Sequence, residues 1–204
     1  MFLDALGTLV ELESPWLGLR EVLDDGVSEE RLIGAVRAEM AYYKEHSHEG
    51  RDAESLAELR ERSAAVLSRE LGRDVDAATL VDAIRFSAFA DAAPALEALR
   101  GRGLRLVCVS NWDCSLQMVL ERCGLAAVLD GVVSSAEAGA RKPDPAIFAP
   151  ALALADCEPG EALHVGDTPD EDLAAARAAG IRALLIDRDG GGDISSLTEL
   201  EAIQ

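Results

Sequence analysis

The chain has 204 residues, 49% of them hydrophobic, which is enough to bury the core of one domain with a modest insertion. Its 38 acidic and 19 basic residues give a formal net charge of −19, which argues against nucleic acids and anionic membranes as partners. The four cysteines form no Cys-x-x-Cys pair, and no histidine stands at zinc-ligand spacing. We therefore expect no disulfide framework and no zinc site, and a reducing, cytoplasmic location.

The first residues predict a buried strand that ends in a carboxylate. Phe2 and Leu3 lead directly to Asp4, and Gly7-Thr8 follows, which is typical of a strand that presents an acidic side chain before a tight turn. Only three residues precede Asp4, so either this strand is short or the natural start lies upstream. We expect no signal peptide, because Asp4 interrupts the apolar run, and no run approaches the length of a membrane span.

Residues 13–87 form a predicted helical insert. Capping residues precede helical patterns at four places, which are Ser14-Pro15, Ser28, Asp52 or Ala53, and Asp76. The second helix is expected to run towards Tyr43 and the third to stop at Gly72. Apolar residues of the third recur near helical spacing, so we expect an amphipathic bundle. The predicted division is thus an α/β core of residues 1–12 and 88–204 with a helical cap of residues 13–87.

After the insert, strand and helix patterns alternate. Strands are expected at 104–109, 131–134, 162–165 and 182–186, and helices at 94–100, 113–124, 144–154 and 170–179. Residues 190–192 are all glycine and predict a loop before a final helix at 195–202. Such alternation predicts a parallel sheet with helices on both faces and right-handed crossovers. Ligands of these sheets bind beyond the carboxyl ends of the strands, where Asp4, Ser110 and Asp167 fall.

Four motifs occur in a characteristic order along this pattern. Asp4 with Gly7-Thr8 is followed by Ser110, by Lys142 in Arg-Lys-Pro-Asp-Pro, and by Gly166-Asp167 with further acids. This order resembles the haloacid dehalogenase superfamily of hydrolases, and the resemblance extends from Asp4 to about Asp187. It implies a Rossmann-like doubly wound core with a helical cap inserted after the first motif.

The resemblance also implies a set of roles for the site. Asp4 would attack phosphorus and form an aspartyl-phosphate, while Lys142 would pair with Asp4 and with the bound phosphate. The implied phosphate-binding groups are Thr8, Ser110, Asn111 and Lys142. The implied ligands of Mg²⁺ are Asp4, the main-chain oxygen of Leu6 and Asp167, with Asp172 orienting waters or Lys142. Asp170 and Glu171 compete with Asp172 for that last role, since acids also favour helix N-termini.

One position departs from the family pattern. Phosphatases of this superfamily usually carry a second Asp two residues after the nucleophile, as a general acid and base, and this chain has Leu6. The carbonyl of Leu6 can bind a metal, but its side chain cannot protonate a leaving group. We therefore expect slow hydrolysis of alkyl phosphates and faster hydrolysis of esters with acidic leaving groups.

Alternative functions remain open at this point. The chain could be a 2-haloacid dehalogenase, which also lacks the second Asp, or a phosphonate hydrolase with Lys44 as a Schiff-base lysine. A binding or regulatory protein that has kept the fold is a third alternative. His46, His48 and Arg51 could line the substrate face of the cap, whereas His164 fits a buried position in the sheet. The preferred hypothesis is a magnesium-dependent phosphatase acting on a small phosphorylated metabolite; its natural substrate and oligomeric state are not readable.

Overall fold

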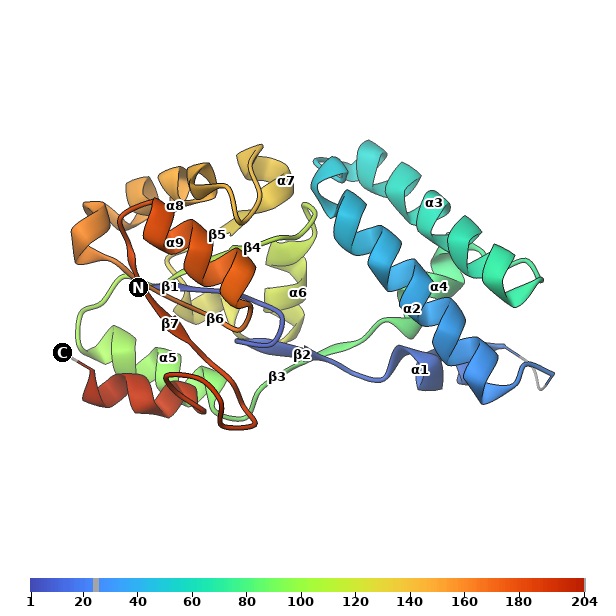
Figure 1. The fold of residues 1–204 in the computed structure, drawn as a ribbon, viewed down its shortest axis with the longest axis horizontal. Helices are drawn as coiled ribbons and strands as arrows, with labels where there is room; N and C mark the ends of the chain where they lie inside the picture. Colours follow the sequence, from blue (N-terminus) through green and yellow to red (C-terminus); the bar gives the residue numbers. More distant parts are fainter. Residues whose placement is uncertain (24–25, 204) are drawn as a thin grey trace.

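A computed structural model describes residues 1–23 and 26–203. Its main sheet has five strands in the order β5-β4-β1-β6-β7, and every neighbouring pair is parallel (Figure 1). The strands are β1 (Phe2–Leu3), β4 (Val107–Ser110), β5 (Gly131–Ser134), β6 (Leu163–Gly166) and β7 (Arg182–Leu185). Phe2 pairs with Val107 on one side and with His164 on the other, so the short first strand is central. The predicted α/β class with a parallel sheet is confirmed.

Helices cover both faces of this sheet. Successive strand residues point to opposite faces. Phe2 accordingly packs in a cluster with residues of α8 and α9, while Leu3 packs in another with residues of α5, α6 and the last helical segment, η6. These elements are α5 (Ala92–Gly101), α6 (Leu116–Arg122), α8 (Phe148–Ala155), α9 (Ala174–Ala178) and η6 (Leu197–Ala202). The core therefore has three layers, as the alternating sequence pattern predicts.

Short helical segments connect the larger elements. They are η2 (Ala126–Val128), α7 (Ser135–Ala138), η3 (Pro145–Ile147), η4 (Pro159–Glu161) and η5 (Pro169–Leu173). The helix predicted at 170–179 is therefore two segments, a π-helical turn, η5, followed by α9. The sequence analysis did not predict α7, which is only four residues long. A single turn is too short to show a helical period.

The described secondary structure from residue 15 to residue 83 is all helical, and this segment forms a unit beside the core (Figure 1). We call this unit the helical insert. Its elements are α1 (Pro15–Val22), α2 (Glu29–His46), η1 (Ser47–Glu49), α3 (Ala53–Leu71) and α4 (Ala77–Ala83). The side chains of Ser28, Asp52 and Asp76 cap α2, α3 and α4, as their types predict. An apolar cluster of its own, which includes Leu19, Leu32, Val36, Leu67 and Leu80, holds the insert together.

A two-stranded antiparallel ribbon joins the insert to the core (Figure 1). It consists of β2 (Val10–Leu12) and β3 (Phe86–Ala88), in which Leu12 pairs with Phe86 and Val10 with Ala88. The expectation of helices without strands up to residue 87 is therefore wrong at its end. Three-residue strands show no sequence period, and this pairing joins residues more than 70 positions apart in the chain. Across residues 1–23 and 26–203, no helix has both the length and the apolar character to cross a bilayer.

Candidate active site at the carboxyl ends of the strands

Asp4 lies directly after β1, at the carboxyl edge of the sheet. Its main-chain N–H donates to the carbonyl of Val165 at 2.9 Å, which continues the pairing with β6 and fixes where the carboxylate emerges. Gly7 has a φ of 83°, and a Cβ at this residue would collide with the carboxylate of Asp167. A Cβ at Gly166 would likewise collide with Asp172. These two glycines therefore let the acidic side chains come close to the backbone.

Lys142 is the centre of the site. Its side chain is 2% exposed, and its Nζ donates to Asp4 Oδ1 at 2.5 Å, to Asp172 Oδ1 at 2.5 Å and to the carbonyl of Val109 at 3.1 Å. All three donors of the ammonium are thus used inside the protein. The structure brings the predicted lysine to the predicted nucleophile.

Asn111 holds the main chain of this lysine. Its Oδ1 accepts from the N–H of Lys142 at 2.8 Å, and its Nδ2 donates to the carbonyl of Lys142 at 2.9 Å and to Glu171 Oε2 at 3.0 Å. The sequence analysis assigned Asn111 to phosphate binding and did not foresee this clamp. A Ser-Asn pair after a strand gives no signal for a contact with a residue 31 positions further on.

Asp172 is the acid that reaches Lys142, whereas Asp170 is exposed and Glu171 is half-buried. Asp172 is 2% exposed; its Oδ1 also contacts His164 Nε2 at 2.9 Å, and its Oδ2 accepts from the N–H of Thr168 at 3.0 Å. The prediction that His164 is buried in the sheet is confirmed. Its contact with Asp172 was not predicted. Of the three acids considered for a role beside Lys142, only Asp172 contacts this lysine in the described structure.

The charges of the site interact strongly. Burial raises the pKa of Asp4 to about 7, although Lys142 opposes the rise. Burial also acts on Asp172, but the charge and hydrogen bond of Lys142 and the contact with His164 outweigh it and lower the pKa of Asp172. Burial raises the pKa of Asp167, and the nearby Asp172 adds to the rise. The site therefore concentrates negative charge that a cation would stabilise.

Three carboxylates could hold such a cation. Asp4, Asp167 and Asp172 each offer one oxygen, and these atoms lie within 4.8 Å of one another. Oxygen ligands of this kind suit Mg²⁺, which binds through one or two carboxylates, waters and substrate oxygens. Both oxygens of Asp172 already have partners, since Oδ1 contacts Lys142 and His164 and Oδ2 accepts from Thr168, so Asp4 and Asp167 are the better placed of the three. The donor set therefore fits the predicted ligands.

Thr8 differs from the other predicted residues. Its side chain is fully buried, and its hydroxyl has no hydrogen-bond partner in the described structure. Its main-chain oxygen accepts from Arg188 Nη2 at 2.6 Å, and Arg188 also pairs with both carboxylate oxygens of Asp91 at 3.0 Å. The sequence analysis missed this anchor of the Gly7-Thr8 turn, for which an Arg and an Asp almost 100 positions apart give no signal. Thr8 is also not among the described residues that line the large cavity next to Asp4.

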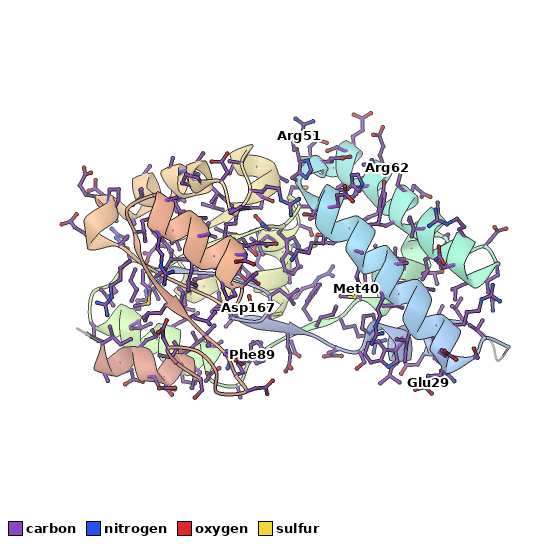
Figure 2. All side chains as sticks on the ribbon, viewed as in Figure 1. Glu29, Met40, Arg51, Arg62, Phe89 and Asp167 are labelled. Carbon is purple, nitrogen blue, oxygen red and sulfur yellow. The ribbon has the colours of Figure 1, made fainter. Side chains whose placement is uncertain are left out.

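A cavity of about 800 Å³ opens between the core and the helical insert. Its core side includes the predicted site residues Asp4, Leu6, Ser110, Asn111, Lys142, Asp167 and Asp172. The insert contributes Met40, Tyr43 and Lys44 from α2, and Figure 2 shows Met40 and Asp167 on the facing edges of the two units. Of the candidates in the insert, His46, His48 and Arg51 are not among the lining residues, and His46 instead pairs with Glu49 at 2.8 Å.

Polar contacts close the insert onto the core at the end of α2. Two of these contacts join side chains: Tyr43 donates to Asp113 Oδ2 at 2.8 Å, and Lys44 Nζ lies 2.8 Å from Glu171 Oε1. Two more reach main-chain carbonyls of the insert: the N–H of Cys114 donates to Gly50 at 2.8 Å, and the side chain of Arg141 donates to Glu45 at 3.1 Å. Lys44 is 63% exposed, so its ion pair is hydrated and weak. Through Glu171 and Asn111 it is nevertheless linked to the main chain of Lys142.

The fold and the site together define a parallel α/β core with an acidic residue directly after its first strand. The family model described as "Hydrolase: haloacid dehalogenase-like hydrolase" matches residues 1–180. The chain therefore belongs to the haloacid dehalogenase-like hydrolases, and the resemblance drawn from the four motifs is confirmed.

Curated relatives match about half of the chain, and two of them illustrate this. The haloacid dehalogenase-like hydrolase domain-containing protein 3 of Bos taurus is 45% identical over 91 residues, which cover 45% of this chain and 36% of that protein. The phosphoserine phosphatase of Thermus thermophilus is 38% identical over 120 residues, which cover 58% of this chain and 48% of that protein. The match thus spans less than half the length of either relative.

Solved structures match nearly the whole chain. The HAD phosphatase from Thermococcus onnurineus has a TM-score of 0.72 at 25% identity and covers 99% of this chain and 95% of its own. The L-2-haloacid dehalogenase from Xanthobacter autotrophicus has a TM-score of 0.73 at 22% identity and covers 99% and 96%. The second likeness shows the fold alone.

Proposed function

We propose that this protein is a magnesium-dependent phosphatase that acts on small phosphorylated molecules through an aspartyl-phosphate on Asp4. One observation carries the proposal: Asp4, bonded to the buried Lys142 at 2.5 Å, opens into a cavity of about 800 Å³. The phosphoserine phosphatase relative supports the choice of a phosphate ester. The four cysteines are free thiols, in keeping with the cytoplasmic location that we propose with it.

The chemistry follows from the positions of the side chains. An Oδ of Asp4 attacks phosphorus in line, the bond from phosphorus to the leaving oxygen breaks, and water then hydrolyses the aspartyl-phosphate to inorganic phosphate. Lys142 favours the ionised form of Asp4 and offsets part of the phosphate charge, while Ser110 and the main-chain N–H of Asn111 would donate to phosphate oxygens. Asp4, Asp167 and the main-chain oxygen of Leu6 would hold Mg²⁺, which supplies positive charge to the phosphoryl group.

Leu6 sets the expected leaving-group preference. Its side chain is 39% exposed and lines the cavity, where it has no proton to give. General acid assistance is worth about 10²–10⁴-fold, so alkyl phosphates should react slowly and aryl or acyl phosphates faster. The substitution Leu6→Asp should raise the ratio of alkyl to aryl phosphate turnover. An unchanged ratio would show that this explanation is wrong.

The decisive experiment measures phosphate release from p-nitrophenyl phosphate and acetyl phosphate. We expect release with Mg²⁺, a large loss with EDTA, and no release by the Asp4→Asn variant. A phosphate label that appears on the wild-type protein but not on the Asp4→Asn variant would identify Asp4 as the nucleophile. Failure to release phosphate from either ester would reject the phosphatase proposal.

Leu6 also favours a second candidate function, carbon–halogen hydrolysis. Haloacid dehalogenases resemble this chain in lacking the second Asp, and the Xanthobacter autotrophicus enzyme shares its fold. Chloride release from 2-chloropropionate in EDTA would support that function. A Schiff-base role for Lys44 would instead appear as borohydride trapping with an aldehyde substrate, but its Nζ is already paired with Glu171. Binding of Mg²⁺ and phosphate without labelling of Asp4 would indicate a binding protein.

A further inference from the structure

The cavity beyond Asp4 is bounded by exposed apolar side chains. Six large apolar residues are exposed in the described structure, and three of them, Leu6, Met40 and Met118, line this one cavity with 37–40% exposure. Single exposed apolar side chains are normally scattered, so their gathering in one cavity marks a ligand surface. Leu6 and Met118 belong to the core and Met40 to the insert, so both units contribute.

Further apolar side chains extend this surface on both sides. The lining includes Leu12, Leu80, Val81, Ile84, Phe86, Trp112 and Val119. The rings of Phe86 and Trp112 lie 5.0 Å apart at an angle of 57°, which gives the core side an aromatic wall. Polar residues of both units line the cavity too, among them Glu39, Arg60 and Ser63 of the insert, so the apolar side chains form one part of its wall, which suits the apolar part of a ligand.

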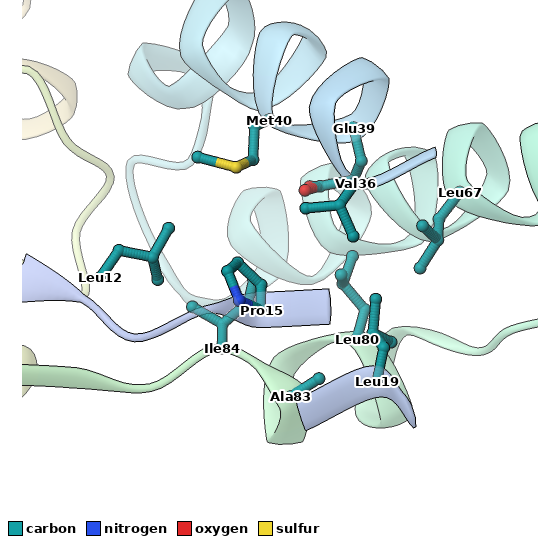
Figure 3. A pocket seen from close by; sticks show the side chains of 10 residues that line it. All are labelled: Leu12, Pro15, Leu19, Val36, Glu39, Met40, Leu67, Leu80, Ala83 and Ile84. Atoms are coloured by element: carbon teal, nitrogen blue, oxygen red, sulfur yellow. The ribbon is translucent and has the colours of Figure 1, made fainter. Parts of the chain in front are cut away.

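A smaller cavity lies beside this surface, where the insert meets the ribbon, and it shares Leu12, Met40, Leu80 and Ile84 with the lining of the large cavity. It has a volume of about 20 Å³, which is room for a single water molecule. Figure 3 shows the Glu39 carboxylate among its apolar side chains, with Met40 turned towards Leu12. The large cavity is therefore the one that can accept an organic group.

Several charged side chains also line the large cavity; Glu39 and Asp113 are buried, whereas the basic side chains other than Lys142 are half-buried or exposed. Lys44 and Arg85 are 63% and 57% exposed and pair with Glu171 and Glu21. Their charges are thus largely neutralised and hydrated. Arg122, also exposed, and the half-buried Arg60 are the groups that a second anionic group on a substrate would use, and the test below includes that outcome.

We propose that the leaving group of the substrate is a phenol with an apolar ring or side chain, so that the substrates are phosphate monoesters of apolar phenols rather than of sugars or polyols. This inference rests on the proposed function, because in-line attack by Asp4 directs the leaving group away from it into the cavity. Leu6 contributes twice, since its side chain contacts an apolar leaving group and since a phenol needs little protonation as it departs.

The first test compares phenyl, 4-ethylphenyl and 4-butylphenyl phosphate, whose phenols have similar acidity. Each buried methylene contributes about 0.8 kcal/mol, so kcat/KM should rise by up to about fourfold per methylene and at least about tenfold over the series. Met40→Gln and Met118→Gln should flatten this rise. Leu17→Gln, a change at a 57% exposed residue of α1 that does not line the cavity, should leave it unchanged.

A second test reads binding without turnover. The chain has two tryptophans, so Trp16→Phe leaves Trp112 of the cavity wall as the only indole reporter. We expect 4-butylphenol to change its fluorescence saturably and at lower concentration than phenol. Met118→Gln should weaken that binding.

The outcomes separate the two proposals. Saturable binding of 4-butylphenol without hydrolysis of any phosphate ester would support the apolar site and reject the phosphatase function. Hydrolysis with no rise along the series, or a preference for 4-carboxyphenyl phosphate or glycerol phosphate, would overturn the apolar leaving group and keep the phosphatase function. A rise that Met40→Gln and Met118→Gln leave intact would also overturn it.

Discussion

Replacing Lys142 by methionine tests whether this lysine neutralises the buried carboxylates. The Lys142 side chain is 2% exposed, and those of its partners Asp4 and Asp172 are 9% and 3% exposed. Methionine has a similar length but no charge and no donors, so Lys142→Met leaves two buried carboxylates without their shared cation. We expect a large loss of stability together with loss of activity.

The size of the loss follows from burial. Removing one partner of a buried ion pair costs about 3–5 kcal/mol, because the remaining charge stays desolvated. With a urea m-value of about 1–3 kcal/mol/M, the urea midpoint should fall by roughly 1–5 M. Mg²⁺ should reduce the loss, because a dication at Asp4 and Asp167 replaces part of the missing positive charge.

Urea unfolding followed by circular dichroism, in EDTA and again in Mg²⁺, measures both effects. Lys44→Met is the matched control, since Lys44 is the other lysine of the chain and its 63% exposed ion pair is worth less than about 1 kcal/mol. Adding Asp172→Asn to Lys142→Met should recover part of the stability, because it removes one unpaired charge. A loss for Lys142→Met no larger than that for Lys44→Met would refute the reasoning.

Three further predictions concern residues outside the cluster of Asp4, Lys142, Asp167 and Asp172. Tyr43→Phe removes the hydrogen bond to Asp113, which is worth about 1.5–3 kcal/mol with a charged acceptor. The insert should then open more often, which would increase acrylamide quenching of tryptophan fluorescence. Unchanged quenching would show that this hydrogen bond does not hold the insert against the core. Burial acts to raise the pKa of Asp91, but Arg188 and two further donors outweigh burial, and the net effect is a lowered pKa. The ionised carboxylate therefore stabilises the fold at pH values above its usual pKa, and this stabilisation is lost in acid. Asp91→Asn should therefore cost about 1.5–3 kcal/mol near pH 7 and clearly less near pH 3 in urea unfolding, whereas an equal loss at both values would contradict this. Burial raises the pKa of Glu39, so the folded state keeps this proton to higher pH than the unfolded state and loses stability as the pH rises. Glu39→Gln should therefore stabilise the protein more at pH 8 than at pH 5. Equal effects at the two pH values would show that Glu39 does not cause the loss of stability.

The fold was predictable because its signals are local. Alternating strand and helix patterns give a parallel sheet, and Ser28, Asp52 and Asp76 mark helix starts by their capping chemistry. The site residues Asp4 and Lys142 were predictable as well, since motif order and strand ends place them at one edge of the sheet. Their distance of 138 positions in sequence did not matter, because the topology brings them together.

The unpredicted contacts all depend on side-chain direction or on pairing between distant segments. Nothing in the sequence shows that Asn111 clamps the main chain of Lys142, or that the hydroxyl of Thr8 is buried away from the cavity. The ribbon of β2 and β3 exists only because two three-residue segments meet. The choice of Asp172 over its neighbours required the turn of η5, which points one of three successive acids inward.

The balance of charge in the site supports our proposal that the protein uses a metal ion. Asp4 and Asp172 share the single ammonium of Lys142, and Asp167 adds a third carboxylate nearby. A phosphate dianion would therefore approach a site that is already negative, in a protein whose formal net charge is −19. Lys142 alone cannot reverse this, because its donors are already used by Asp4, Asp172 and the Val109 carbonyl. A dication between Asp4 and Asp167 would make the site attractive to phosphate and would keep Asp4 ionised for attack.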